Sequence, residues 1–199
     1  MRNTTTAILL AAGRARRMGR PKILLRADGE TLLARSLAAL GKICAVTVAV
    51  LPEELPAARK IAQSAGAQCV AGASDGEMMD SLRRALAVIP RGTPVCVALG
   101  DQPLRPKLPW LRTLAALAAN HPDLPVLPLY RGQRGHPVFL PATLCDSLRE
   151  TPPAGGLREL LRAAPELIFL ETGDPLAVLD LDTPEDWRRF RHDIRRAPR

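Results

Sequence analysis

The sequence predicts an α/β fold in which a mostly parallel sheet is covered by helices on both faces. Short aliphatic runs alternate with longer amphipathic stretches along the whole chain. The aliphatic runs are continuous rather than alternating with polar residues, which is typical of parallel strands buried on both faces. The length of 199 residues suits one such domain, and 47% apolar residues is an ordinary globular composition. We expect a single domain over residues 1–199, with a flexible arginine-rich tail at about residues 195–199.

The expected strands are short aliphatic runs, several of them rich in valine and bounded by proline or glycine. In chain order they are Thr6–Ala11, Cys44–Leu51, Ala67–Ala71, Pro94–Leu99, Pro125–Tyr130, Pro137–Leu140, Leu167–Glu171 and Leu176–Leu181. Open sheets of this kind bind ligands at the carboxyl ends of their strands. The loops after the first, fourth and last of these strands are therefore where we expect the chemistry.

The expected helices carry leucine, isoleucine or alanine at intervals of three and four residues, which places the apolar side chains on one face. In chain order they are Thr31–Leu40, Pro52–Ala65, Met78–Ile89, Leu108–Ala119, Pro141–Glu150, Gly156–Ala163 and Thr183–Arg195. Thr183 is the expected N-cap of the closing helix, because Glu185 and Asp186 follow in its first turn.

Composition and charge exclude several classes of protein. No apolar run approaches the ~20 residues of a membrane span, and Ala7–Ala12 is too short for a signal peptide. The formal charge is +8, but the arginines concentrate in Arg14–Arg20 and Arg188–Arg199, and only 3% of the residues are aromatic. This distribution does not favour nucleic acid as a ligand. We therefore expect a cytoplasmic protein with neither a membrane nor a nucleic-acid partner.

A glycine- and arginine-rich loop follows the first expected strand. Gly13 and Gly19 permit close approach of the backbone, and backbone N–H groups in such a loop can bind an anion. The loop also carries the basic residues Arg14, Arg16, Arg17, Arg20 and Lys22. Its spacing is neither that of a P-loop nor that of the dinucleotide-binding fingerprint. It predicts a site for one polyphosphate, with a plain basic surface loop as the alternative.

Carboxylates lie at the ends of two further expected strands. Asp101 follows Pro94–Leu99, and Asp180 and Asp182 lie at the end of Leu176–Leu181, where an extended chain would place both on one face. Mg²⁺ takes one or two carboxylates together with phosphate oxygens. The alternatives are an ordinary turn at Asp101 and a helix-capping role at the closing pair. Combined with the arginine-rich loop, these carboxylates favour metal-assisted phosphoryl chemistry.

These motifs resemble those of the MobA-like NTP transferases, and within them the molybdenum cofactor cytidylyltransferase branch. The resemblance covers essentially the whole chain. In order, the matching motifs are Leu10-Ala-Ala-Gly13 with Arg17-Met-Gly-Arg-Pro-Lys22, Gly29–Leu33, Met78 with Ser81-Leu82, Gly100–Pro103, Arg134–Pro137 and Asp180–Asp186. The resemblance implies a three-layer α/β/α, Rossmann-like nucleotidyltransferase fold. It also implies transfer of a nucleotide from an NTP with release of pyrophosphate.

The resemblance also implies roles for individual residues. Arg17 would bind the β- and γ-phosphates, and Lys22 would bind the α-phosphate and stabilise its transition state. Asp101 would hold Mg²⁺ together with Asp180 or Asp182. The implied nucleotide-binding residues are Leu10, Ala11, Ala12, Gly13, Arg14, Gly19, Met78 and Ser81. The implied acceptor-binding residues are Arg134, Gly135 and His136, although a structural role for His136 in its turn is an equal alternative.

The implied reaction joins CTP to a molybdopterin-type cofactor, which gives the cytosine dinucleotide form and pyrophosphate. Ala12 favours the pyrimidine branch over GTP. Three departures from the family pattern are Ala15 at a usual serine, Met79 at a small polar position, and Pro152–Gly156 at a Gly-Asp-x-Gly segment. Other readings are a different phosphorylated acceptor, a non-catalytic carrier that hands the cofactor to a recipient molybdoenzyme, and nucleic-acid binding through the arginine tail.

Overall fold

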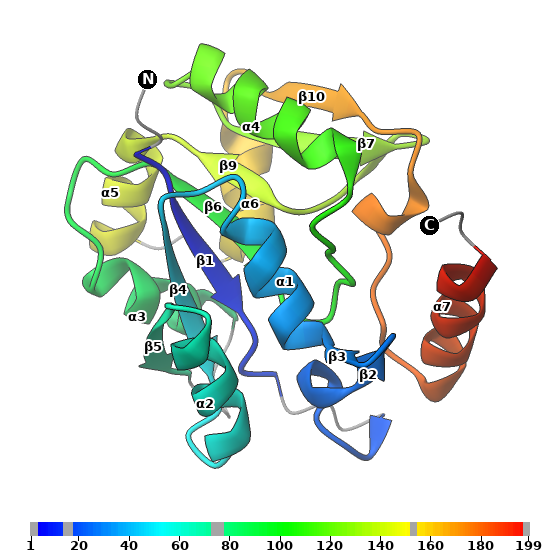
Figure 1. The fold of residues 1–199 in the computed structure, drawn as a ribbon. Coiled ribbons are helices and arrows are strands. Elements are labelled where there is room, and N and C mark those ends of the chain that lie inside the picture. The colour runs from blue at the N-terminus through cyan, green and yellow to red at the C-terminus, as the bar shows by residue number, and fades with distance from the viewer. Residues whose placement is uncertain (1–3, 14–17, 73–77, 152–154, 197–199) are drawn as a thin grey trace.

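The computed structural model describes residues 4–13, 18–72, 78–151 and 155–196, with side chains as far as His192. Its described part contains one large sheet, in the strand order β10-β7-β9-β6-β1-β4-β5, with β8 paired to β7 (Figure 1). The strands are β1 (Thr6–Leu10), β4 (Val46–Leu51), β5 (Gln68–Ala71), β6 (Val95–Leu99), β7 (Val126–Tyr130), β8 (Gln133–Arg134), β9 (Val138–Leu140) and β10 (Ile168–Glu171). Neighbouring strands are parallel except for the antiparallel β8 and β9. The expected mostly parallel sheet is confirmed.

Helices pack on both faces of this sheet and give three layers. The described helices are α1 (Leu32–Leu40), α2 (Pro56–Ser64), α3 (Met78–Ala87), α4 (Pro109–Asn120), α5 (Ala142–Glu150), α6 (Gly156–Ala163) and α7 (Pro184–Arg196). Side chains of α1, α2 and α4 share one core cluster with Ala7 and Leu9 of β1. Side chains of α3, α5 and α6 share the other with Ile8 and Leu10. Successive residues of β1 thus alternate between two apolar layers, which explains its uninterrupted aliphatic sequence.

Helix α7 lies beside the three layers and packs on a third, smaller apolar cluster (Figure 1). Trp187 and Phe190 of α7 share this cluster with Met18. The Thr183 hydroxyl accepts a hydrogen bond from the Asp186 backbone N–H at 3.2 Å, and the Asp186 carboxylate accepts one from the Thr183 N–H at 2.8 Å. This reciprocal cap confirms Thr183 as the start of the closing helix.

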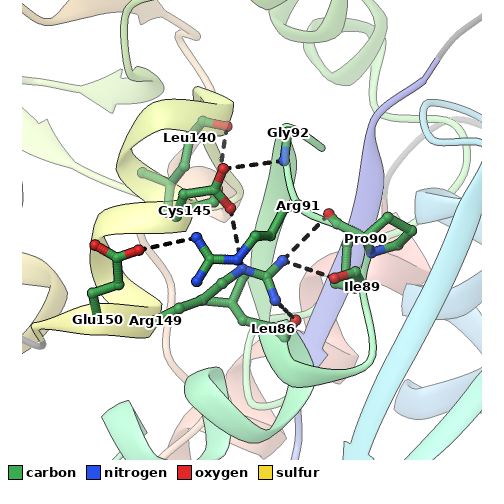
Figure 2. A network of polar contacts seen from close by, with 10 residues as sticks. Leu86, Ile89, Pro90, Arg91, Gly92, Leu140, Cys145, Arg149 and Glu150 are labelled. Atoms are coloured by element: carbon green, nitrogen blue, oxygen red, sulfur yellow. Dashed lines mark hydrogen bonds and ion pairs between the residues drawn. The ribbon is translucent and has the colours of Figure 1, made fainter.

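Helix α5 is joined to the end of α3 by the guanidinium of Arg149 (Figure 2). Arg149 donates to the backbone carbonyls of Leu86 and Ile89, the latter at 2.8 Å, and its Nε lies 3.3 Å from Asp146 Oδ1. The last carbonyls of a helix have no partner inside the helix. Arg149 supplies a donor to Leu86 in the last turn of α3 and another to Ile89 just beyond the helix, and the sequence pattern carried no signal for these contacts.

The prediction of a strand at Leu176–Leu181 is wrong. The segment begins inside the 3₁₀ turn η3 (Pro175–Ala177) and continues as irregular chain. The Asp174 carboxylate accepts hydrogen bonds from the Leu176 N–H at 2.9 Å and the Trp110 Nε1–H at 3.1 Å, which stabilises the turn. The helix expected over Pro52–Ala65 spans Pro56–Ser64, with Pro56 in its first turn, where the missing N–H of proline costs no helical hydrogen bond.

Two short antiparallel pairings were absent from the expectations. Strands β2 (Arg26–Ala27) and β3 (Glu30–Thr31) form a hairpin whose turn residues, Asp28 and Gly29, both have positive φ. An Asp-Gly turn is a recognised hairpin signal that could have located it. Strand β8 pairs with β7 in the same way around Arg131 and Gly132. None of the described helices is long and apolar enough to cross a membrane.

Candidate functional site

The loops that follow β1, β5 and β6 pack against one another at the carboxyl edge of the sheet. A Cβ on Gly100 would lie 2.6 Å from the Ala11 Cβ, and one on Gly72 only 2.1 Å from the Ala12 Cβ. Only glycine fits at both positions. Ala11 and Ala12 are consequently buried, while Gly13 is exposed at the surface of the loop. Gly72 was missed in the sequence, although a glycine directly after a strand is a signal of close backbone approach.

Lys22 is brought to this edge by the 3₁₀ turn η2 (Lys22–Leu24), whose Ile23 is buried. The Lys22 ammonium lies 2.6 Å from Asp182 Oδ1 and 3.7 Å from Asp101 Oδ2. The lysine side chain is 13% exposed, whereas those of Asp101 and Asp182 are 36% and 40% exposed. The structure therefore gathers three of the residues singled out in the sequence, from three distant parts of the chain.

Among the described residues the charge around Asp101 is negative. Burial raises the pKa of Asp101, the nearby Lys22 opposes that rise, and the carboxylates of Asp180 and Asp182 add to it. The Leu181 N–H donates to the Asp101 backbone carbonyl at 3.0 Å, which holds the segment before α7 against the loop after β6. Carboxylates outnumber the lysine among these described side chains, which favours a further cation.

Asp180 and Asp182 have different partners and do not act as a pair on one face. Asp182 contacts Lys22, whereas Asp180 Oδ1 accepts a hydrogen bond from Gln102 Nε2 at 3.0 Å. The expectation of a shared face assumed a strand that is not formed. Gln102 is 3% exposed, and its Oε1 has no hydrogen-bond partner in the described part of the chain. Sequence reasoning missed the role of Gln102, because a glutamine beside a turn proline carries little signal.

The donor set fits a hard divalent cation. Among the described residues no group of three or more histidine, cysteine, aspartate or glutamate side chains is arranged to hold a metal ion. Asp101 and Asp182 nevertheless offer partly exposed carboxylate oxygens on either side of one ammonium. Mg²⁺ and similar ions take one or two protein carboxylates and complete their shell with water and phosphate oxygens. The residues present suit such a shared site rather than a complete protein cage.

The segment expected to bind an acceptor lies beside the 3₁₀ turn η3. The His136 N–H donates to the Ala177 carbonyl at 3.0 Å, and a Cβ on Gly135 would lie 2.0 Å from that same oxygen. Burial lowers the pKa of His136 to about 4, with the Asp180 carboxylate opposing the shift, so the imidazole is neutral near pH 7. Arg134 is exposed, and its guanidinium lies 5.4 Å from the centre of the Phe169 ring.

Helix α3 carries the remaining expected nucleotide-binding residues. Ser81 is buried and Met78 is 45% exposed. Met79 is buried in the core cluster that includes Leu157 of α6. Leu10 is buried at the end of β1, and Gly19 is exposed after Met18. Arg14, Ala15, Arg16, Arg17, residues 152–154 and residues 197–199 lie outside the described residues, so the structure is silent on them.

The chain has relatives among proteins of known structure. Rv0371c from Mycobacterium tuberculosis is 29% identical, with a TM-score of 0.80 over 96% of this chain and 99% of that one. A structure of the same protein in complex with manganese has a TM-score of 0.74 at 28% identity, again over 96% and 99%. Molybdopterin-guanine dinucleotide biosynthesis protein A from Archaeoglobus fulgidus, 17% identical with a TM-score of 0.67 over 97% and 100%, shares the fold.

A curated relative and a family profile match as well. The 2-C-methyl-D-erythritol 4-phosphate cytidylyltransferase of Frankia casuarinae is 32% identical over 164 residues, or 76% of this chain and 56% of that protein. The chain thus spans little more than half the length of this relative. The profile of the MobA-like NTP transferase domain matches residues 7–167, a stretch that includes Lys22 and Asp101. The chain therefore belongs to the MobA-like NTP transferase family.

Proposed function

We propose that this nucleotidyltransferase is a Mg²⁺-dependent cytidylyltransferase that joins CTP to a molybdopterin-type cofactor and releases pyrophosphate. The observation that carries the proposal is the placement of the Lys22 ammonium 2.6 Å from Asp182 Oδ1 and 3.7 Å from Asp101 Oδ2. A fixed cation at the carboxyl edge of an α/β sheet is what transfer at a phosphorus atom needs.

In the proposed reaction, a phosphate oxygen of the acceptor forms a bond to the α-phosphorus of CTP. The bond from that phosphorus to the bridging oxygen of the β-phosphate breaks, and pyrophosphate leaves with the electron pair. Lys22 stabilises the charge that develops on the α-phosphate oxygens. The acceptor phosphate is already an anion near neutral pH, so its attack requires no catalytic base.

The divalent ion would be held by Asp101 and by an aspartate of the closing pair, Asp182 or Asp180. When bound, it neutralises charge on the phosphate oxygens of the nucleotide. The manganese complex of Rv0371c supports a divalent metal in a close relative. Asp182 forms an ion pair with Lys22 in the chain itself, which keeps both groups at the position that the nucleotide would occupy.

The remaining expected residues keep their proposed roles around this centre. Arg17 would bind the β- and γ-phosphates, and Arg134, Gly135 and His136 would contact the acceptor. The residues proposed to contact the nucleotide are Leu10, Ala11, Ala12, Gly13, Arg14, Gly19, Met78 and Ser81. A recipient molybdoenzyme is the proposed protein partner.

A second candidate acceptor is 2-C-methyl-D-erythritol 4-phosphate. The name of the Frankia relative, which is 32% identical over 164 residues, favours it. Both candidates use CTP and present a phosphate monoester, so the same arrangement of Lys22 and Asp101 serves either. Use of GTP and a non-catalytic carrier role remain the alternatives that the experiment must separate.

The test is pyrophosphate release with Mg²⁺ from CTP, GTP, ATP or UTP, each with molybdopterin cofactor, with 2-C-methyl-D-erythritol 4-phosphate, or with neither. We expect release from CTP only when the molybdopterin acceptor is present, and its loss in Lys22→Ala and Asp101→Ala. Lys60→Ala, an exposed lysine on α2, is the matched control. Pyrophosphate release only with 2-C-methyl-D-erythritol 4-phosphate would show that this compound, not the molybdopterin cofactor, is the acceptor. Release from GTP instead of CTP would show that GTP is the nucleotide substrate. Binding of the cofactor without any release would favour the carrier role.

A further inference from the structure

A cavity lies at the amino end of the sheet, away from the carboxyl-edge loops. It has a volume of about 420 Å³ and is lined by residues from the segment before β1, the loop after α1, helix α4, the loop after α4 and the end of β9. Figure 1 shows the start of β1 near the N-terminal label and the carboxyl end of the strand pointing toward β2 and β3. A volume of this size suits a small organic ligand.

The walls of the cavity are mostly apolar. Phe139 and Leu140 of β9 line it and are themselves buried, at 5% and 1% exposure. Helix α4 contributes the alanines Ala115, Ala116, Ala118 and Ala119. Four short side chains on one stretch of helix leave a hollow where leucines would fill the space, so the cavity follows directly from the α4 sequence.

Among the described lining residues the charged groups are cations, Lys42 from the loop after α1 and Arg112 from α4. Thr4, Thr5 and His121 also line the cavity. No aspartate or glutamate is among the described lining residues. The arginines Arg149 and Arg189, by contrast, each lie within 4 Å of a carboxylate. Cations from two separate elements around an apolar hollow favour an anionic head group attached to an apolar body.

We propose that this cavity binds a small organic anion, with its acidic group near Lys42 and Arg112 and its apolar body against Phe139 and the alanines of α4. A carboxylate, sulfonate or phosphate ester of an aromatic or branched aliphatic body has this chemistry. The site lies at the opposite end of the sheet from Lys22 and is independent of the nucleotidyl-transfer proposal.

The test uses two fluorescent probes that share an aromatic body. 1-Anilinonaphthalene-8-sulfonate is an anion, and N-phenyl-1-naphthylamine is its uncharged counterpart. We expect the sulfonate to bind the folded protein with 1:1 stoichiometry and more tightly than the amine. Arg112→Ser should weaken sulfonate binding about tenfold, because a charge-assisted contact contributes about that factor. Binding of the uncharged amine should not change in this variant.

Three further variants keep the test specific. Arg158→Ser removes an exposed arginine of α6 that does not line the cavity and should leave sulfonate binding unchanged. Lys22→Ala, at the other end of the sheet, should also leave it unchanged. Ala118→Trp should fill the hollow and abolish binding of both probes, with the thermal midpoint confirming that the variant is folded.

Several results would overturn the proposal. Equal affinity for the two probes would show that no cation takes part, and equal weakening by Arg158→Ser would show adsorption to general surface charge. Loss of sulfonate binding in Lys22→Ala would place the probe at the carboxyl edge. Unchanged binding in a folded Ala118→Trp protein would place it outside the cavity.

Discussion

Two cationic side chains, Lys22 and Arg149, are equally buried at 13% exposure but have opposite surroundings. Arg149 donates to backbone carbonyls at the end of α3 and contacts the carboxylate of Asp146, which is itself 29% exposed (Figure 2). Lys22 faces two carboxylates, Asp101 and Asp182, that are more exposed than it is. Burial alone therefore does not separate a structural cation from a functional one.

What separates the two is the state of their partners. Both terminal nitrogens of the Arg149 guanidinium donate to backbone carbonyls in the last turn of α3 and just after it, so neither is left for a ligand. The carboxylates around Lys22 exceed it in charge and remain accessible, and the pKa of Asp101 is raised by burial and by its acidic neighbours. Such crowding of like charges costs stability and is expected where a metal ion binds.

The largest expected effect is the loss of activity in Lys22→Ala. Removal of one positioned charge from a transition state costs about 10²- to 10³-fold in kcat. The free energy of unfolding should change by only about 1 kcal/mol or less, because the ion-pair partners are partly exposed. Pyrophosphate release and urea denaturation measure the two quantities, with Lys60→Ala as control. A large loss of stability without loss of kcat would reverse the assignment of Lys22.

Arg149→Ala should show the opposite pattern. It removes the guanidinium from the carbonyls of Leu86 and Ile89 and from the Asp146 carboxylate, although the Ile89 N–H still donates to Leu86 and the Gly92 N–H to Asp146. The free energy of unfolding should fall by about 2 kcal/mol. The kcat of the folded fraction should not change. Arg149→Lys keeps the charge but lacks the planar fork, and we expect it to recover only part of the loss. Full recovery with lysine would show that charge, not the geometry of the donors, stabilises this helix end.

His136 sharpens the comparison through pH. Burial lowers its pKa in the folded protein to about 4, from an ordinary value of 6.5. Below pH 6.5 the unfolded chain takes up a proton that the folded protein refuses, so stability falls as the pH drops toward 4. The slope of the free energy of unfolding against pH approaches about 1.4 kcal/mol per pH unit, and above pH 6.5 the contribution of His136 to this slope vanishes. The difference between wild type and His136→Gln isolates this term from the carboxylates.

Urea denaturation at a series of pH values between 4 and 7.5 provides the measurement. Asn120→Gln, at an exposed position on α4, is a control that changes no titratable group and should leave the slope unchanged. An unaltered slope in His136→Gln would mean that the imidazole is solvated in the folded protein. It would also contradict the lowered pKa of His136, to which burial and the Asp180 carboxylate contribute with opposite sign.

The parts of the fold that follow from local pattern were predictable from the sequence. β1, β4 and β6 are continuous aliphatic runs because they are buried on both faces, and the Thr183 cap is a local motif. The strand prediction for Leu176–Leu181 failed because Asp174 and Pro175 form a turn there, despite the aliphatic composition of the segment. Periodicity carries no information on such a local hydrogen bond.

The site was predictable in its residue types but not in its contacts. Lys22 and Asp182 lie 160 positions apart, and only the resemblance of ordered motifs joined them before the structure did. Gln102 and Arg149 were missed because their partners are set by tertiary packing. In a sequence, an arginine on an amphipathic helix is indistinguishable from one exposed to solvent.

The smallest expected effect is that of Arg91→Ala, which tests whether exposure sets the value of an ion pair. Arg91 donates to Glu150 at 2.9 Å, but both side chains are 64% exposed (Figure 2). Water and salt screen such a pair, so the urea midpoint should not move measurably. Arg91 and Arg149 both join the region after α3 to α5, and only Arg149 is buried. Equal losses in the free energy of unfolding for Arg91→Ala and Arg149→Ala would show that short distance, not burial, decides the strength of these contacts. The burial of Arg149 would then not explain its structural role, and the contrast with Lys22 would lose its physical basis.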